Sequence, residues 1–261
     1  MLRSMAERAS RGVAFWRRLP ADMGGIRMRV SPESGGLRYW KLNLESVDGR
    51  LLGLAREIVK PGSAVWDVGA NVGLMTFAAA ALAGPKGFVL AVEPDVDNQR
   101  LILKSIAENA GRIAPVELVC AAVSNASKRF ARFEIASRSR SSNALAGLGN
   151  TQGGSVRETR TVILLTLDDL LDGFRAPDFI KIDVEGAESD ALAGATRVLA
   201  GPRPIFHIEV NDECIEGVTR QLQAADYVLF DGSLPGPQRT AQIEKAVWDT
   251  LAIPKEKVAG V

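Results

Sequence analysis

Val65-Trp66-Asp67-Val68-Gly69-Ala70-Asn71-Val72-Gly73 is the stretch that decides the fold of this 261-residue chain. An apolar run ends in an acid and continues into a loop with glycine at positions 69 and 73, and a helix-like segment from Leu74 to Leu82 follows. This pattern is typical of the strand, tight turn and helix N-terminus that hold a nucleotide-like cofactor in α/β proteins. Glycines without a Cβ let a ligand and the helix approach the backbone closely. The free N–H groups of the first helical turn then face a negative group of the ligand.

The loop alone does not decide the cofactor. A dinucleotide fingerprint reads G-x-G-x-x-G, whereas here Asn71 and Leu74 stand in place of the second and third glycines. The spacing instead resembles motif I of class I S-adenosylmethionine (SAM) methyltransferases. An ordinary strand-to-helix turn is the simpler alternative.

A second acid narrows the choice. Phe88–Val92 is an apolar run rich in β-branched residues, which indicates a buried strand. Glu93 ends it about 20 residues after the glycine loop, the offset at which an acid binds ribose hydroxyls in nucleotide-binding units. A carboxylate accepts two hydrogen bonds from a vicinal diol and disfavours a 2′-phosphate, so NADP is not expected. The alternative is that Glu93 only ends a strand in solvent.

Composition limits the remaining classes. Hydrophobic residues make up 46% of the chain, which is enough for one large domain. The net charge of +1 provides no overall attraction to nucleic acid or an anionic membrane. Basic residues outnumber acids only near the start of the chain, so a phosphate- or lipid-contacting arm is one interpretation and a solvated or partner-facing extension the other. These residues are Arg3, Arg8, Arg11, Arg17, Arg18, Arg27, Arg29 and Arg38.

Neither a membrane segment nor a disulfide framework is expected. No run of 18 or more apolar residues occurs, and arginines interrupt the N-terminus where a signal peptide would be apolar. Cys120 and Cys214 lie in apolar contexts without metal-ligand spacing. We therefore expect a soluble, cytoplasmic protein.

Strands and helices alternate through most of the chain, which predicts a parallel sheet covered by helices on both faces. Residues 1–40 instead predict an irregular or partly helical extension. The expected strands are 64–68, 88–92, 116–120, 179–184, 204–210, 227–230 and 247–253. The expected helices are 51–59, 74–82, 95–109, 167–174, 186–200 and 213–224.

The middle of the chain departs from this alternation. Residues 129–135 and 157–167 read as strands, and a long Ser-, Arg- and Gly-rich loop joins them. Long loops in compact domains are usually functional or disordered. We interpret this insertion as a β-hairpin-like flap over the substrate end, with plain disorder as the alternative.

Carboxylates follow the fourth strand of the predicted sheet. Lys181 and Asp183 share one face of that strand, and Asp183 lies at its carboxyl end, where open α/β sheets bind ligands. If the strand order reverses between the first and fourth strands, Asp183 lies beside Asp67 and the glycine loop. Glu185 and Glu188 begin the next helix, where a negative charge favours the helix dipole. This capping role explains Glu185 as well as function does, and it explains Glu188 better than function does. Lys181 is expected to pair with one of these acids.

The fifth strand carries the next candidates, His207 and Glu209, which share a face by alternation. His207 is the only histidine in the chain, which excludes a multi-histidine metal site. A lone histidine in an apolar strand is more often a core residue than a catalyst. No Ser-His-Asp arrangement or nucleophile elbow is present, so covalent hydrolysis is not expected.

These residues together resemble the FkbM family of SAM-dependent methyltransferases over roughly residues 50–254. The segments that carry the resemblance are 65–73, Val92-Glu93-Pro94, Thr166–Leu170, Asp178–Glu188, Gly194-Ala195 and Ile208-Glu209. The run I-K-I-D-V-E-G-A-E paired with the loop D-V-G-A-N-V-G is highly specific. The resemblance implies a class I methyltransferase fold, a Rossmann-like doubly wound α/β sheet of seven strands with the last antiparallel. It divides the chain into an extension, 1–45, and a methyltransferase domain, 46–261.

The resemblance also implies the cofactor and its ligands. Gly69, Ala70, Asn71 and Gly73 look like the methionine-side loop, Glu93 like the ribose ligand, and Ala122 belongs to the segment that borders the adenine. Asp67, at the end of the first strand, joins these cofactor-binding candidates. Ser105-Ile106 departs from the family pattern, in which an Asn is frequent, at a peripheral position.

The activity implied is O-methylation of a sugar, glycolipid or polyketide-type hydroxyl. Since a protonated hydroxyl is a poor nucleophile, a general base is expected, with Asp183, Glu209 and His207 as candidates. A variant places Mg²⁺ on Asp183, Glu185 and Glu209, although no spacing requires a metal. The alternatives are N-methylation, a macromolecular substrate, a non-catalytic SAM-binding module and an NAD-dependent oxidoreductase. Nucleic acid is not an expected partner, and the sequence leaves the acceptor's identity and the oligomeric state open.

Overall fold

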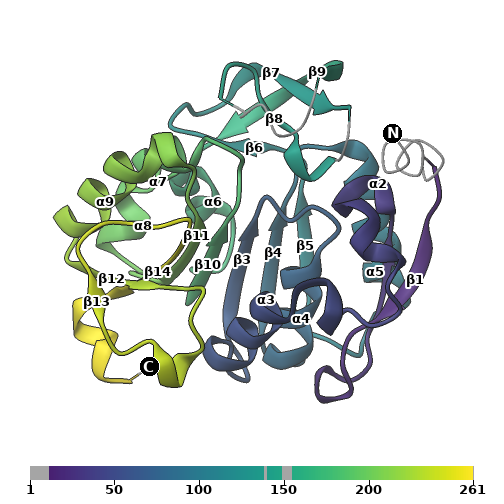
Figure 1. Ribbon diagram of the computed structural model, residues 1–261, viewed down its shortest axis with the longest axis horizontal. Helices are drawn as coiled ribbons and strands as arrows, with labels where there is room; N and C mark the ends of the chain where they lie inside the picture. Colours follow the sequence, from purple (N-terminus) through teal and green to yellow (C-terminus); the bar gives the residue numbers. More distant parts are fainter. Residues whose placement is uncertain (1–11, 138–139, 149–154, 261) are drawn as a thin grey trace.

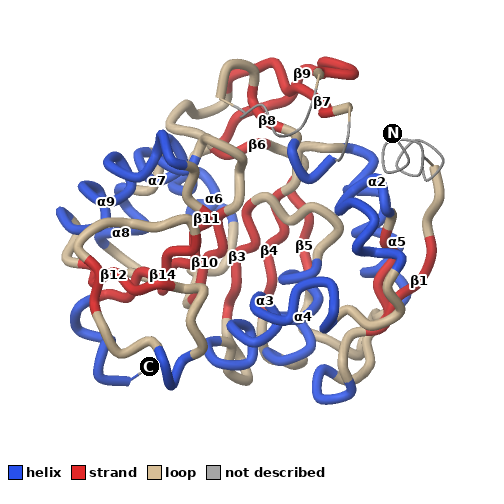
Figure 2. Tube along the Cα trace, viewed as in Figure 1, coloured by secondary structure: helices blue, strands red, loops and turns tan. Residues whose placement is uncertain are grey.

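The structure is a computed structural model that describes residues 12–137, 140–148 and 155–260. Its centre is an open sheet with helices on both sides (Figures 1 and 2). In spatial order the strands are β13 (Gln242–Ile243), β12 (Tyr227–Asp231), β14 (Asp249–Pro254), β11 (Ile205–Glu209), β10 (Phe179–Ile182), β3 (Ala64–Val68), β4 (Phe88–Val92) and β5 (Val116–Val119).

Strand direction confirms the predicted doubly wound arrangement. Every neighbouring pair from β11 to β5 is parallel, whereas β14 runs antiparallel to both β11 and β12. These are the seven strands expected, with the last one antiparallel. The two-residue strand β13 adds an eighth at the edge beside β12, and the prediction missed it because two residues carry no periodicity.

The strand order reverses at β3, which has β4 on one side and β10 on the other. Val68, the last residue of β3, pairs with Ile182, the last residue of β10, and its carbonyl accepts a 3.0 Å hydrogen bond from the Asp183 N–H. The expected neighbourhood of Asp183 and the glycine loop is therefore confirmed. A reversal of this kind opens a crevice at the carboxyl ends of the two strands.

Helices on each face enclose a separate hydrophobic core. One face carries α3 (Glu45–Ile58), α4 (Leu74–Ala83) and α5 (Val96–Glu108), and the other carries α6 (Leu167–Gly173), α7 (Glu188–Ala193), α8 (Thr196–Ala200) and α9 (Ile215–Ala224). Because side chains alternate along a strand, Val65 packs into the first core while Trp66 and Val68 pack into the second. Both faces of the central strands are thus buried, which explains their continuous apolar runs.

The described part of the N-terminal extension is more regular than predicted. Its elements are β1 (Phe15–Arg18), η1 (Ala21–Met23), β2 (Arg27–Val30), α2 (Pro32–Gly35) and η2 (Gly36–Trp40), and β1 pairs with β2 as an antiparallel hairpin. Met28, Val30 and Leu44 are fully buried in the core that also contains α4. The extension is therefore packed against helices α4 and α5 on one face of the sheet; its boundary as a separate unit stays a prediction.

The predicted flap is a second sheet. It consists of β6 (Ala122–Val123), β7 (Arg129–Ala136), β8 (Ala144–Leu145) and β9 (Val156–Leu165), with η3 (Arg140–Ser142) between β7 and β8. β7 and β9 are antiparallel, as expected for a hairpin-like flap, and Figure 1 shows this sheet beyond the carboxyl ends of β3, β4 and β5. Residues 138–139 and 149–154 of the predicted loop lie outside the described residues.

Two predicted helices have different bounds. The helix expected over 186–200 is divided into α7 and α8 around Gly194 and Ala195; a Cβ on Gly194 would lie 2.5 Å from the Ser124 carbonyl oxygen, so the chain passes close to the flap there. The helix expected over 51–59 begins at Glu45 and contains a break at Asp48. Short 3₁₀ turns complete the described elements: η5 (Asp212–Cys214), η6 (Gly236–Gln238) and η7 (Lys255–Gly260).

None of the helices in the described part of the chain combines the length and the apolar character needed to cross a membrane.

Candidate cofactor and acceptor site

The loop after β3 is shaped by its contact with the end of β10. Gly69 has φ +75°, and a Cβ there would lie 1.8 Å from the Asp183 carbonyl oxygen, so only glycine fits. Asn71 also has a left-handed backbone, with φ 55°, a conformation that asparagine tolerates better than most residues. The glycine requirement at position 69 thus comes first from the neighbouring strand and not from a ligand.

Asp67 lies beneath this loop and holds the start of α4. It is fully buried, and its Oδ2 accepts hydrogen bonds from the Thr76 N–H at 2.8 Å and the Thr76 hydroxyl at 2.5 Å. Thr76 is in the first turn of α4, where backbone N–H groups have no intrahelical partner. The other oxygen, Oδ1, lies 3.7 Å from Lys181 Nζ. Asp67 therefore holds the start of α4, and with it the preceding loop, against the end of β3.

Glu93 is held in place by backbone and side-chain donors. Its Oε2 accepts from the Asn71 N–H at 2.7 Å, and its Oε1 accepts from the Asp95 N–H at 2.8 Å and from Asn98 Nδ2 at 3.4 Å. Burial raises the pKa of Glu93 to about 8, and the nearby Asp95 charge adds to this effect. Each carboxylate oxygen has two lone pairs, so Oε2 can accept one more hydrogen bond.

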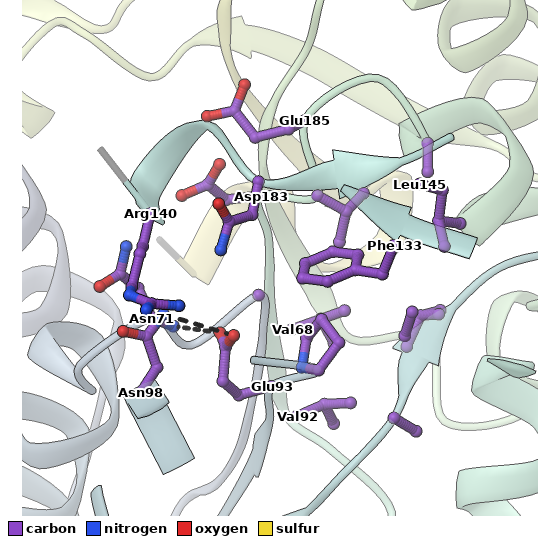
Figure 3. Close-up of a pocket in the computed structure, with 18 of the residues that line it drawn as sticks. Val68, Asn71, Val92, Glu93, Asn98, Phe133, Arg140, Leu145, Asp183 and Glu185 are labelled. Carbon is purple, nitrogen blue, oxygen red and sulfur yellow. Dashed lines mark hydrogen bonds between the residues drawn. The ribbon is translucent and has the colours of Figure 1, made fainter. Parts of the chain in front are cut away.

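A cavity opens in front of Glu93 at the reversal of strand order. Figure 3 shows Glu93 flanked by Asn71 and Asn98, with Phe133 and Leu145 of the flap on the opposite side. The empty space between its walls, part of it open to solvent, is about 570 Å³, of which about 50 Å³ can hold the centre of a water molecule. The total lies within the ~300–1,000 Å³ typical of ligand pockets, but the walls are close together.

Several residues predicted from the sequence line this cavity and others do not. The predicted residues that line it are Gly69, Asn71, Glu93, Ala122, Asp183 and Glu185. Asp67, Ala70 and Gly73 are not among its lining residues; Ala70 is buried and Gly73 precedes α4 with a left-handed backbone. Their role is to shape the loop, and direct cofactor contact by these three stays a prediction.

The flap contributes cavity residues that sequence reasoning missed. They are Phe133, Arg140, Ser141, Asn143 and Leu145, together with Asn98 of α5. The only sequence signal was the Ser- and Arg-rich composition of residues 137–143, which marked a functional loop without indicating which side chain turns inward.

Arg140 ties the flap to the segment after Glu93. It is 7% exposed and forms ion pairs with Asp95 at 2.6 Å, Asp97 at 2.9 Å and Glu33 at 3.3 Å. Asn143 Nδ2 also donates to Asp95 Oδ2 at 2.8 Å. The buried Arg140 side chain thus joins the flap to the N-terminal extension and to the segment that follows Glu93.

A group of charged residues occupies the carboxyl ends of β10 and β11. Lys181 is buried and donates hydrogen bonds to Asp183 Oδ2 at 3.0 Å and to the Gly69 carbonyl at 3.2 Å. Burial alone would lower the pKa of Lys181, but the charges of Asp183, Asp67 and Glu209 outweigh it and the pKa is raised. Lys181 is thus a fixed positive charge between the acids, as the sequence indicated.

Two glutamates near this lysine favour their protonated form. The negative charge of Asp183 and then burial raise the pKa of Glu209. Burial, followed by the charges of Asp183 and Glu209, raises the pKa of Glu185 to about 8. Glu185 also has φ 51°, a strained conformation for a glutamate that structures retain mostly at functional sites.

His207 lies two residues before Glu209 on β11, and its ring contacts Asp249. Its Nε2 lies 2.5 Å from Asp249 Oδ1, while Nδ1 is buried without a partner among the described residues. Asp249 forms a further ion pair with Arg50 at 2.8 Å. His207, Glu209 and Asp249 line a small cavity against α3. Arg50 also lines this cavity, and the sequence did not identify Asp249 or Arg50 as site residues.

Within residues 12–137, 140–148 and 155–260, no group of three or more His, Cys, Asp or Glu side chains is arranged to hold a metal ion. The donor set that the Mg²⁺ alternative needs, Asp183, Glu185 and Glu209, is therefore not assembled here, and we derive no step through a metal.

Residues 67–229 match the model of the methyltransferase FkbM domain. Among solved structures, an FkbM methyltransferase from Methylobacillus flagellatus is 16% identical with a TM-score of 0.46; the alignment covers 80% of this chain and 51% of that protein, so the chain spans about half its length. A precorrin-6y C5,15-methyltransferase from Geobacter metallireducens is 14% identical (TM-score 0.46, 78% and 87% covered). A SAM-dependent O-methyltransferase from Thermotoga maritima is 13% identical (TM-score 0.43, 78% and 63% covered). No curated protein sequence matches the chain.

Proposed function

Because this chain belongs to the FkbM family of SAM-dependent methyltransferases, we propose that it transfers the methyl group of SAM to a hydroxyl of a sugar, glycolipid or polyketide-type molecule. The observation that supports the proposal is that Glu93 and Asp183 line one cavity at the reversal of strand order. Glu209 ends the neighbouring strand β11 and lines a separate small cavity. A cytoplasmic location and the absence of a nucleic-acid partner stay predictions.

The residues of the cavity fit the nucleoside of SAM. Ribose hydroxyls are hydrogen-bond donors, and Glu93 presents an oxygen with accepting capacity. The Oδ1 atoms of Asn71 and Asn98 are buried and have no hydrogen-bond partner among the described residues, an arrangement that is costly unless a donor joins them. The apolar wall of Phe133 and Leu145 suits a flat base. When bound, SAM supplies a methyl group on a sulfonium, which is a good leaving group.

The protein's contribution is to position the acceptor and remove its proton. Holding two reactants in line can supply roughly 7–11 kcal/mol of the barrier. Glu209 is the favoured base, because its raised pKa makes its carboxylate a stronger proton acceptor than that of an ordinary glutamate. Lys181 donates a hydrogen bond to Asp183 and so fixes the position of that side chain. His207 is less suitable, since its Nε2 is already engaged by Asp249.

A radiolabelled methyl-transfer assay tests the proposal. We expect label from SAM to appear on hydroxyls within a panel of sugars, glycolipids and polyketide alcohols, and micromolar binding of S-adenosylhomocysteine (SAH) but not of NAD by calorimetry. Glu209→Gln should lower kcat about 10²–10⁴-fold, the usual contribution of a general base, and leave SAH affinity unchanged.

Glu213→Gln, at an exposed position on the turn after β11, is the matched control and should retain full activity. Label found only on amines, protein or RNA would contradict O-methylation. Full activity of Glu209→Gln would remove Glu209 from the mechanism. Binding of SAH without transfer to any substrate would favour a non-catalytic module.

A further inference from the structure

A groove lies beside α3, on the face of the sheet that carries Glu209. Its walls are largely apolar and include Leu54, Phe230, Leu234, Pro235, Ile253 and Val258. The empty space between them, part of it open to solvent, is about 1,650 Å³, and about 850 Å³ of this can hold the centre of a water molecule. It is thus far roomier than the cavity at Glu93.

The charged side chains that border the groove are neutralised by partners. Arg239 pairs with Glu57 at 2.6 Å, and its side chain is 5% exposed. Arg56 pairs with two acids, at 2.6 and 2.8 Å, and Arg50 pairs with Asp249. The groove therefore presents apolar surface and satisfied ion pairs, which favours an uncharged occupant because an unpaired buried charge is costly.

The groove adjoins the cavity of the candidate base. Arg50, Leu54 and Gly232 line both the groove and the small cavity that contains Glu209 and His207. The Arg50 side chain, 61% exposed, lies at the junction with its guanidinium on Asp249. A molecule that fills the groove therefore contacts residues that also border the cavity of Glu209.

We propose that this groove binds the uncharged, apolar part of the methyl acceptor, whose hydroxyl reaches Glu209 past Arg50. The inference rests on the proposed hydroxyl methylation and narrows it to acceptors that combine a polar head with an extended hydrocarbon portion. Burial of each additional methylene should then raise affinity by up to about fourfold, until the groove is filled.

Gly53 makes the groove testable without disturbing the fold. It lies on α3 and lines the groove, and a Cβ built there meets no atom within 4 Å. Gly53→Phe should place a ring in the groove. Gly53→Ala is the matched control: it also removes the glycine, which is unfavourable in a helix, but it leaves the groove open. The probes are ethyl, hexyl, octyl and decyl β-D-glucosides below their micelle concentrations, titrated by calorimetry into the SAH-bound protein.

We expect affinity to rise from ethyl to decyl glucoside, and Gly53→Phe to weaken decyl glucoside binding at least tenfold while ethyl glucoside and SAH binding stay unchanged. Gly53→Ala should behave as the natural protein does. Affinity independent of chain length, or Gly53→Phe that binds decyl glucoside normally, overturns the inference. If hydroxyls are methylated regardless of the alkyl chain, the groove inference alone fails. If no hydroxyl is methylated, the proposed reaction fails, and the groove loses its role as acceptor site.

Discussion

Glu93 and Asp67 show how two acids at the ends of adjacent strands acquire different roles. Asp67 is enclosed by Thr76 and Lys181: its Oδ2 accepts both hydrogen bonds from Thr76, and its Oδ1 forms an ion pair with Lys181. Glu93 receives its hydrogen bonds from one side and borders the cavity on the other. Side-chain environment, more than residue type, therefore separates the structural acid from the candidate ligand.

Glu93→Gln should weaken SAH binding by about 1–3 kcal/mol, the usual cost of leaving a buried hydrogen-bonding group without its partner. The amide would also turn an N–H group toward either the Asn71 or the Asp95 N–H, both of which now donate to the carboxylate. Calorimetric titration of SAH measures the change. Glu117→Gln, on the exposed face of β5, is the control and should have no effect; equal affinity of both variants would remove Glu93 from the site.

At the scale of elements, Arg140 joins the flap to the segment that follows Glu93. Three acids from two different segments surround its guanidinium, and Arg160 adds ion pairs to Asp95 and Asp97. The flap thereby rests directly on the cavity and narrows it. Since removal of one partner leaves buried charge uncompensated, this contact should control how readily the flap moves.

Arg140→Ala should loosen the flap. We expect amide hydrogen exchange in β7 and β9 to accelerate at least tenfold and SAH to dissociate faster, while strands β3 and β10 keep their protection. Mass spectrometry of exchanged peptides and stopped-flow displacement of SAH provide the two measurements. Arg129→Ala, at an exposed position of β7, is the control; exchange rates equal to this control would show that Arg140 does not hold the flap.

For the whole molecule, burial of acids at the crevice couples folding stability to pH. The pKa values of Glu93 and Glu185 are raised to about 8 from the ordinary value of 4.5. Between these values the folded state keeps protons that the unfolded chain has lost. Stability should therefore decrease as pH rises from about 4.5 to about 8, by at most ~1.4 kcal/mol per pH unit for each group.

Urea unfolding at pH 5, 6.5 and 8 measures this dependence. The double variant Glu93→Gln/Glu185→Gln should show a flatter profile in this window, because it lacks two of the carboxyls with a raised pKa and keeps only Glu209. Acids with lowered pKa values, such as Asp97 and Asp249, lose their stabilising effect as pH falls below their ordinary value of 3.8 and leave this interval unaffected. Identical profiles for both proteins would contradict the assignment.

Local sequence determined much of this protein. Apolar runs, the glycine loop and the spacing to Glu93 predicted strands β3, β4 and β10, the helices between them and the family, since these depend on periodicity and short-range turn chemistry. The tertiary structure alone decided that Arg140 pairs with Asp95, 45 residues earlier, that Asp249 engages His207 across 42 residues, and that α3 and β12 enclose a groove. Such contacts depend on which distant segments the folded chain brings together, and no local pattern encodes that path.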